Sequence, residues 1–526
     1  MRPGIGATME LAPSLAQSLA GIEAPFRWLV GADDGASYQL TRWVFLRLLA
    51  VIYLIAFASL RVQIRGLVGA GGILPVGEML ARARRLGRRR WRALPTLFWL
   101  RADDAALTGA CDAGMAISAL LLAGVAPIPC LVALWALYLS LTVAGQEFLS
   151  FQWDVLLLEA GFLAIFLAPA TLLPGLEREA AVSPLALALL WWLLFRLMFE
   201  SGVVKLTSGD PTWRGLSALE VHYFTQPLPT PPAWYAHQLP RWFHRLSAVL
   251  MYAIELGLPF LIFGPRPGRL AACAGLVLLQ LLILLTGNYN FFNLLSIALC
   301  LLLVDDAIWE RALPATLLAG HVGPGGPVAP TSPWRLLPTL AVAAPFLLIG
   351  AAHLGRSLRP RWRAPHLLSV LERELAPFRS LSAYGLFRVM TVRRPEIIVE
   401  GSRDGERWQA YEFRFKPGAP ERRPPWVQPH QPRLDWQMWF AALRSQGAVP
   451  WFQAFAERLL VGAPQVLALL AKDPSPEGPP RFLRARLYDY RFTDLAERRR
   501  SGAWWRRELL GAYSPVLTIR PPSEAP

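Results

Sequence analysis

The chain is poor in cysteine and in lysine. Its four cysteines all lie in apolar stretches, so the sequence offers neither a disulfide framework nor a CxxC zinc or redox pair: Cys111, Cys130, Cys273 and Cys300. The lysines are three, in a total of 53 basic Lys and Arg residues: Lys205, Lys416 and Lys472. This arginine bias suggests a GC-rich, bacterial genome.

Several catalytic signatures are missing as well. The sequence has no GxSxG elbow, no Walker loop, no GxGxxG between a strand and a helix, and no HExxH pair. Lipid hydrolysis, nucleotide hydrolysis, dinucleotide chemistry and zinc proteolysis therefore have no motif support. The first forty residues also lack the basic start, apolar core and cleavage site of a secretory signal, so we expect no cleaved leader.

Apolar residues, in contrast, are abundant and gathered in blocks. They make up 54% of the 526 residues, and mean hydropathy is +0.35. The blocks predict a polytopic α-helical membrane bundle of about nine spans, with a range of eight to ten. We expect an N-terminal extension (1–42), a transmembrane domain (43–355) and a C-terminal soluble domain (356–526).

Positive charge is concentrated near the first span. The net charge of +16 includes a cluster of seven arginines within an arginine-rich loop (61–104): Arg82, Arg84, Arg85, Arg88, Arg89, Arg90 and Arg92. In a membrane protein such a cluster indicates a cytoplasmic loop or an anionic-lipid contact, and we expect no nucleic-acid partner. An odd number of spans would place the C-terminal domain on the same, cytoplasmic side.

The C-terminal region has the pattern of an α+β, β-rich domain. Short strands are predicted at Glu396–Val399 and Trp408–Phe415, joined by a turn at Asp404–Gly405. Helices are predicted at Leu434–Leu443 and Phe452–Ala471, and a further strand at Arg481–Phe492.

Five ionisable residues fall inside the predicted spans, where an unpaired charge costs roughly 3 kcal/mol: Arg47, Glu159, Arg196, Glu200 and Glu255. Arg196 and Glu200 are four residues apart, so they share a helical face and are expected to pair within one helix. The others have no partner on the same helix. We expect Arg47 to form an ion pair with a glutamate of another span.

The polar loop (205–245) begins with a lysine at a helix end, followed by Asp210 and Trp213. The favoured interpretation is that Lys205 extends to the membrane interface, with Trp213 in the aromatic belt. The alternative is a desolvated Lys205 that acts as a base. His222, His237 and His244 follow, but they lack the spacing of a metal site, and we expect no metal and no cofactor.

Two strings rich in Trp and Arg stand out in the C-terminal domain. Both residue types anchor protein interfaces, although they also occur in domain cores. The partner-binding candidates are His430, Arg433, Asp435, Trp436, Trp439, Trp504 and Trp505. Asp435 can alternatively cap a helix.

Taken in order, several long strings of the chain resemble the lipase maturation factor family. The matching segments are 151–154 (FQWD), 157–162 (LLEAGF), 201–213, 222–231 (HYFTQPLPTP), 286–293 (TGNYNFFN), 400–405 (EGSRDG), 429–443 and 504–507 (WWRR). The resemblance covers about Tyr38 to Tyr513.

The resemblance implies a membrane protein of the endoplasmic reticulum that assists secreted lipases to reach their active state. It also implies that the C-terminal domain contacts the lipase-like client. In a bacterium the location would be the plasma membrane. A cytoplasmic C-terminal domain, as the charge pattern favours, conflicts with clients that fold on the other side.

Two alternatives remain open. The segment from Gly202 to Trp213 resembles, more weakly, the lysine and tryptophan region of vitamin K-dependent carboxylases, which would make the chain a membrane enzyme with Lys205 as base. Transport through the bundle is the other, but no inverted repeat supports it. A non-catalytic folding factor is the leading hypothesis.

Overall fold

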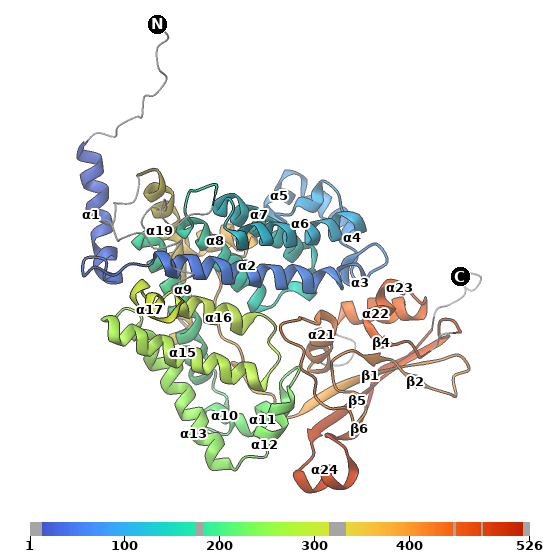
Figure 1. Ribbon diagram of the computed structural model, residues 1–526. Helices are drawn as coiled ribbons and strands as arrows, with labels where there is room; N and C mark the ends of the chain where they lie inside the picture. Colours follow the sequence, from blue (N-terminus) through green and yellow to red (C-terminus); the bar gives the residue numbers. More distant parts are fainter. Residues whose placement is uncertain (1–12, 174–181, 315–332, 445–448, 475–476, 519–526) are drawn as a thin grey trace.

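The computed structural model describes residues 13–173, 182–314, 333–444, 449–474 and 477–518. The first twelve residues of the expected N-terminal extension lie outside these ranges, and helix α1 (Pro13–Val30) follows them. A helical body is joined at one end to a smaller domain that contains the strands (Figure 1).

Six helices in the described part of the chain are long and apolar enough to cross a membrane, or seven spans if one bent pair is counted as a span. The six are α2 (Gln39–Arg61), α6 (Asp104–Ala123), α7 (Pro127–Ala144), α9 (Pro184–Thr207), α15 (Arg266–Thr286) and α19 (Pro333–Leu358). The bent pair is α16 (Phe292–Leu301) and α17 (Asp306–Ala312). The membrane bundle is therefore present, but the expected count of about nine spans is not confirmed.

Three of the expected spans are shorter or interrupted helices. Helix α8 (Gln152–Leu167) has 16 residues and α16 has 10. The segment expected as one span at 246–264 consists of α13 (Arg241–Tyr252), the π-helical turn η5 (Ala253–Gly257) and α14 (Leu258–Leu261). Proline at position 259 and glycine at 257 interrupt the regular hydrogen-bond pattern there.

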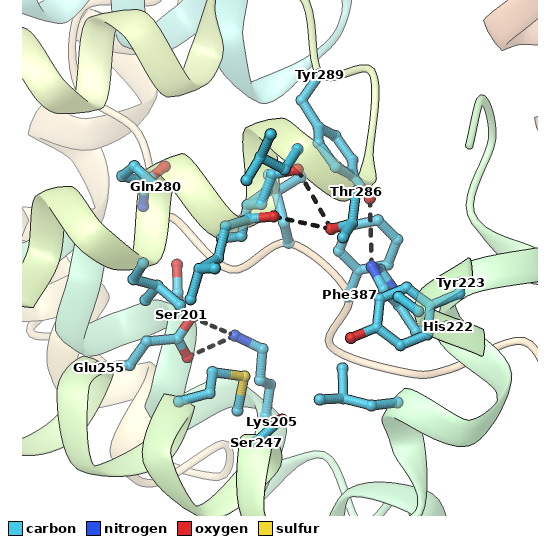
Figure 2. A pocket seen from close by; sticks show the side chains of 18 of the residues that line it. Ser201, Lys205, His222, Tyr223, Ser247, Glu255, Gln280, Thr286, Tyr289 and Phe387 are labelled. Atoms are coloured by element: carbon cyan, nitrogen blue, oxygen red, sulfur yellow. Dashed lines mark hydrogen bonds and ion pairs between the residues drawn. The ribbon is translucent and has the colours of Figure 1, made fainter. Parts of the chain in front are cut away.

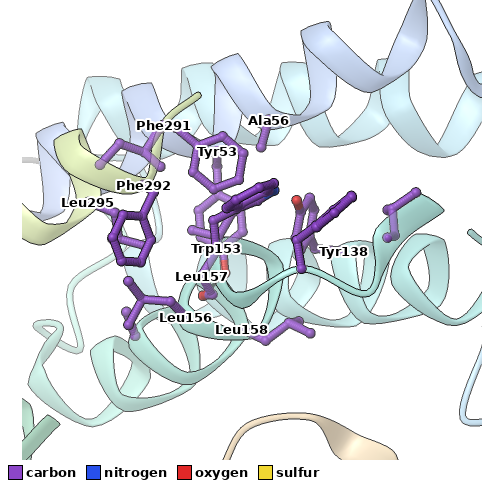
Figure 3. Close-up of a cluster of buried hydrophobic side chains, with 14 of the residues drawn as sticks. Tyr53, Ala56, Tyr138, Trp153, Leu156, Leu157, Leu158, Phe291, Phe292 and Leu295 are labelled. Atoms are coloured by element: carbon purple, nitrogen blue, oxygen red, sulfur yellow. Dashed lines mark hydrogen bonds between the residues drawn. The ribbon is translucent and has the colours of Figure 1, made fainter. Parts of the chain in front are cut away.

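Local sequence explains where the long helices begin and end. The Asp103 carboxylate caps α6 by accepting a hydrogen bond from the Ala106 amide at 2.8 Å, and Gly124 ends the helix in the left-handed conformation. Pro127 then opens α7, so the two helices are antiparallel neighbours. Helices α2, α7, α8 and α16 enclose an aromatic and leucine core that includes Tyr53, Tyr138 and Trp153 (Figure 3).

Short helices form the connections. Between α2 and α6 lie α3 (Ile64–Val68), α4 (Val76–Ala83), α5 (Arg90–Ala93) and the 3-10 turns η1 (Arg84–Arg89) and η2 (Leu97–Trp99). A further 3-10 turn, η3 (Gln146–Leu149), separates α7 from α8. The expected polar loop is also helical: α10 (Pro211–Arg214), α11 (Ala218–Thr225) and α12 (Pro231–His237). Helix α20 (His366–Leu375) and the turn η6 (Ala376–Phe378) lead toward the strands.

The C-terminal domain is built on an antiparallel sheet with the order β2-β1-β5-β6. Its strands are β1 (Arg394–Ser402), β2 (Gln409–Ala410), β5 (Phe482–Phe492) and β6 (Trp505–Leu517). The expected hairpin is confirmed, because β1 pairs with β2 through Glu400 and Ala410, and Gly405 takes a positive φ in the turn. A second sheet pairs β3 (Glu412–Phe413) with β4 (Leu470–Lys472).

The helices of this domain are α21 (Arg433–Ala442), α22 (Pro450–Leu460), α23 (Pro464–Leu467) and α24 (Leu495–Ser501). The prediction of one helix from Phe452 to Ala471 was wrong beyond Leu460. Gly462 adopts a left-handed conformation that ends α22, and the residues after α23 form β4. Strand β6 was not anticipated, because its residues do not alternate between apolar and polar.

The C-terminal domain is held on the helical body by a buried polar seam. Arg433 of α21 makes a bidentate ion pair with Asp154 of α8 at 2.6 and 2.8 Å. Asn288, after α15, accepts a hydrogen bond from the Val427 amide at 2.8 Å. Arg394 of β1 donates to the Phe224 carbonyl at the end of α11, also at 2.8 Å. The two parts thus form one continuous structure.

The arginine-rich loop lies at this same end of the bundle. Arg92 pairs with Glu374 at 2.5 Å, and Gln465 of the C-terminal domain donates to Asp104 at the start of α6 at 3.0 Å. The loop and the C-terminal domain therefore lie at the same end of the helical body.

Candidate functional site

A buried ion pair marks the end of α9. Lys205 Nζ lies 2.7 and 2.5 Å from the two carboxylate oxygens of Glu255, and both side chains are 7% exposed. The π-helical turn η5 carries Glu255 across from α9. Such turns are frequent at functional sites. Gly202 allows the close approach, since a Cβ there would lie 2.7 Å from a Leu256 methyl group.

This geometry corrects the expected role of Lys205. The prediction that it extends to the membrane interface was wrong, because Glu255 neutralises it inside the protein. Trp213 is also buried, at 2% exposure, with its ring centre 5.5 Å from Lys205 Nζ. The Trp213 indole donates to the Phe387 carbonyl at 2.9 Å instead of sitting in an aromatic belt.

A cavity of about 400 Å³ opens beside this ion pair. Figure 2 shows Lys205, Glu255 and Ser201 on one side of the cavity and His222, Tyr223 and Tyr289 on the other. Most of the lining is apolar and comes from α9, α13, α15 and the short helices α11 and α12. Its volume falls within the range of about 300–1,000 Å³ typical of small-molecule sites.

The polar groups of the cavity carry little net charge. Burial, and next the charge of Lys205, lower the pKa of His222 to about 4, so its imidazole is neutral at pH 7. Its Nε2 lies 3.5 Å from the Tyr289 hydroxyl, and its Nδ1 is buried without a hydrogen bond. Tyr289 donates to Gln226 at 2.8 Å.

Asp210 has a structural role. Its carboxylate caps α10 by accepting a hydrogen bond from the Thr212 amide at 2.7 Å, and it also accepts one from the Met390 amide at 2.8 Å. Asp210 and Trp213 thereby fix the segment before β1 against the end of α9. This segment supplies Leu386 and Phe387 to the cavity wall.

A second buried ion pair joins two other elements of the helical body. Arg196 of α9 forms an ion pair with Glu159 of α8, and Glu159 also accepts a hydrogen bond from the Tyr384 hydroxyl at 2.6 Å. Glu200 accepts from the Tyr384 amide at 2.8 Å. The prediction of an Arg196–Glu200 pair within one helix was wrong, because a nearer carboxylate faces Arg196 from α8.

Arg47 contacts an aromatic ring of its own helix. Glu159 binds Arg196 and Glu255 binds Lys205, while the Arg47 guanidinium lies 4.8 Å from the ring centre of Trp43 on the same helix.

The partner-binding candidates of the C-terminal domain are mostly buried, which favours the alternative that they belong to the domain core. Trp436, Trp439, Trp504 and Trp505 are 2 to 8% exposed, and His430 is half-buried. Arg433 binds Asp154, and His430 Nδ1 lies 2.9 Å from the Ser59 hydroxyl. These side chains hold the domain on the helices and cannot serve as a free docking surface.

The other members of this set are also structural. Asp435 accepts hydrogen bonds from the amides of Phe415 and Lys416 at 2.8 and 2.9 Å, so it fixes a loop. Trp439 donates to the Thr225 carbonyl at 2.9 Å. Trp505 packs on Phe492, with ring centres 4.5 Å apart.

Within the described residues, no group of three or more His, Cys, Asp or Glu side chains is arranged to hold a metal ion. His222 faces the cavity, His237 packs against Phe224 and Phe492, and His244 packs against Tyr223.

Sequence reasoning missed Asp154 and Asn288 as organising residues. Asp154 lies at the start of an apolar run, and Asn288 lies in a short break between two such runs. A polar residue at either position is common in such sequences. The role of Asp154 follows from its contact with Arg433, and the role of Asn288 follows from its contacts with residues 425–428.

Each of the two parts of the structure matches a model of a known protein family. Residues 40–311 match the family model described as lipase maturation factor transmembrane domain, and residues 380–515 match the lipase maturation factor C-terminal domain. No solved structure matches significantly.

Similar proteins cover most of the chain. Human lipase maturation factor 2 is 39% identical over 93% of this chain and 84% of its own length. The Gallus gallus protein of that name is 39% identical over 92% and 82%. Bos taurus lipase maturation factor 1 is 36% identical over 97% and 93%. These vertebrate relatives lend no support to a bacterial source. The chain belongs to the lipase maturation factor family.

Proposed function

We propose that this chain is a membrane-embedded, non-catalytic maturation factor for lipases. The observation that carries the proposal is that both segments of the family are present and joined through the buried seam of Arg433, Asp154 and Asn288. The relatives are named for lipase maturation. Nothing in the geometry or the comparisons favours the enzyme alternative. That alternative needs Lys205 as a free base, whereas the Lys205 ammonium forms an ion pair with Glu255.

A client must contact surface that the seam leaves free, and strand β6 offers such a surface. It is an edge strand that pairs only with β5 among the described strands. Its apolar residues Leu509, Leu510 and Val516 are 50, 46 and 53% exposed. An unpaired edge can accept an extended segment of another chain through backbone hydrogen bonds. We infer that partly folded lipase segments dock here.

The proposed location is the endoplasmic reticulum membrane, with the C-terminal domain on the side where secreted lipases fold. Because the arginine-rich loop shares that side, its charge would then oppose the usual bias toward cytoplasmic arginines. A cytoplasmic C-terminal domain would contradict the proposed contact with secreted clients.

The test uses co-expression with a secreted lipase in cells that lack their own maturation factor. Replacing Leu509 and Leu510 together by lysine should reduce secreted lipase activity at least about fivefold, because it places two charges at the proposed docking edge. Membrane levels of the variant should stay normal. Leu495→Lys is the matched control, since Leu495 is 48% exposed on α24 of the same domain.

Unchanged lipase activity in the double variant would overturn the docking surface. Failure of the unmodified chain to raise lipase activity above cells without it would overturn the proposed function itself.

A further inference from the structure

The cavity beside Lys205 and Glu255 points to a ligand that the family assignment does not specify. We propose that it binds a neutral lipid, with an acyl chain in the apolar part and an uncharged hydroxyl or ester head beside His222. A monoacylglycerol has this chemistry.

The shape and lining of the cavity fit a chain. Its volume is about 400 Å³, and most of the wall is formed by apolar side chains, among which leucine is the most frequent. Polar groups are confined to a few positions, among them Ser201, Gln280 and Thr286. A mostly apolar pocket with a few convergent polar groups is the usual form of a site for an amphiphilic small molecule.

The rim indicates that the ligand enters from the bilayer. Leu282 and Leu285 of α15 line the cavity and are 51 and 50% exposed. Phe243 of α13 and Leu239, which precedes it, also line the cavity and are 37 and 41% exposed. Because α15 is a candidate span, an apolar opening between α13 and the last turns of α15 would face lipid.

The charges that line the cavity favour an uncharged lipid head group. Lys205 and Glu255 neutralise each other, and the His222 imidazole is uncharged at pH 7. To pair with Lys205, a fatty-acid carboxylate or a phosphate would have to displace Glu255, which leaves a buried carboxylate unpaired. A hydroxyl or ester carbonyl needs only a hydrogen-bonding partner.

His222 provides that partner. Its buried Nδ1 makes no hydrogen bond, and an unsatisfied buried polar atom is costly. A neutral imidazole can donate from one nitrogen and accept at the other. A lipid hydroxyl reaching His222 would satisfy this atom without adding charge.

The test is photolabelling of the full-length protein in phosphatidylcholine nanodiscs with a 1-acylglycerol that carries a diazirine in its chain. We expect label on α13 and on the last two turns of α15. An excess of 1-oleoylglycerol should remove it, whereas oleate and oleoyl-lysophosphatidylcholine should not. Equal competition by all three, or no displaceable label on these helices, would overturn the proposal.

Two variants address the cavity directly. Ser247→Trp fills it from α13 and should reduce labelling at least about tenfold. Leu246→Trp, on the neighbouring exposed position that does not line the cavity, should leave labelling unchanged. His222→Phe should weaken competition by 1-oleoylglycerol roughly 2- to 10-fold, the value of one hydrogen bond. If Ser247→Trp fails to fold by size exclusion, Ala236→Leu fills the same cavity with less bulk.

Equal labelling of the filled variants and the Leu246 control would show that the label reports lipid around the protein, which would overturn the assignment. The readout involves no lipase, so its result is independent of the proposed function.

Discussion

The buried charges of Lys205 and Glu255 are matched to each other, and breaking this ion pair has a measurable cost. Lys205→Met leaves Glu255 buried without a cation and should lower the free energy of unfolding by about 3–5 kcal/mol. The double variant Lys205→Met with Glu255→Leu removes both charges and should recover most of that loss. Melting temperature in detergent measures both effects.

A double variant that is as unstable as the single one would show that the pair does not act as a unit. Should the double variant keep full stability but lose client maturation, the ion pair would have a role beyond packing.

The seam also predicts a dependence on pH. Burial, and then Arg433 and Arg414, lower the pKa of His430 to about 4 in the folded protein. An unfolded histidine titrates near 6.5, so the unfolded state binds more protons between these values. The contribution of His430 to the free energy of unfolding is therefore fully present above about pH 6.5 and is lost as the pH falls toward 4.

At pH 5 the protonation of His430 in the unfolded state should lower the free energy of unfolding by about 2 kcal/mol. His430→Gln keeps a partner for Ser59 but cannot be protonated, so the decrease in melting temperature between pH 7 and pH 5 should be smaller than in the unmodified protein. An identical decrease in both would assign the pH dependence to other groups.

The sequence identified most of these charges correctly as buried and paired, but not their partners. The cost of a charge in hydrocarbon follows from the residue alone, whereas i, i+4 spacing shows only that Arg196 and Glu200 share a face. The packing of α8 against α9 makes Glu159 the partner of Arg196, and the packing of η5 against α9 makes Glu255 the partner of Lys205. The Trp and Arg strings of the C-terminal domain gave no indication whether they face solvent or the helices.

Among the helices, α2 and α6 pack unusually closely at Gly114. A Cβ at this position would lie 2.4 Å from the Phe57 ring of α2, so either the ring or the helix must move. Gly114→Ala should destabilise the protein by about 1–3 kcal/mol through overpacking. Gly109 lies in the same helix, and a methyl group added there would meet no atom within 4 Å.

Gly109→Ala is therefore the control, and it should be neutral or stabilising by up to about 1 kcal/mol, because glycine weakens a helix interior. Comparison of the two melting temperatures checks the prediction. A Gly114→Ala protein as stable as Gly109→Ala would mean that α2 and α6 are not held together at this point.

Long apolar elements were predictable and interrupted ones were not. The spans α2, α6, α7, α9, α15 and α19 follow from run length alone. The turn η5 and the short helix α8 depend on packing against α9, which hydropathy does not report. Strand β6 escaped prediction for a related reason: as an exposed edge it lacks the buried alternate positions that make a strand recognisable.

For the molecule as a whole, the contacts between the arginine-rich loop and the C-terminal domain predict a common side. Cysteines introduced at Arg88 and Arg403 should react with a membrane-impermeant maleimide from one side of sealed vesicles. A cysteine at Leu172, which is 71% exposed beside the turn between α6 and α7, should react only from the other. The four native cysteines are buried and give a low background.

Labelling of positions 88 and 403 from opposite sides would contradict the observed contacts. The side that reacts also decides whether the C-terminal domain can meet secreted proteins.

The ion pair between Asp154 and Arg433 also constrains how the protein is made. The two residues are 279 positions apart, so a ribosome adding about 5–20 residues per second needs roughly 15–55 s to supply the arginine after the aspartate. Throughout that time the nascent bundle holds a carboxylate that has no counter-ion. Closure of the seam is consequently a late event in biogenesis, and a chain terminated before α21 exposes unfinished polar surface that quality control can recognise.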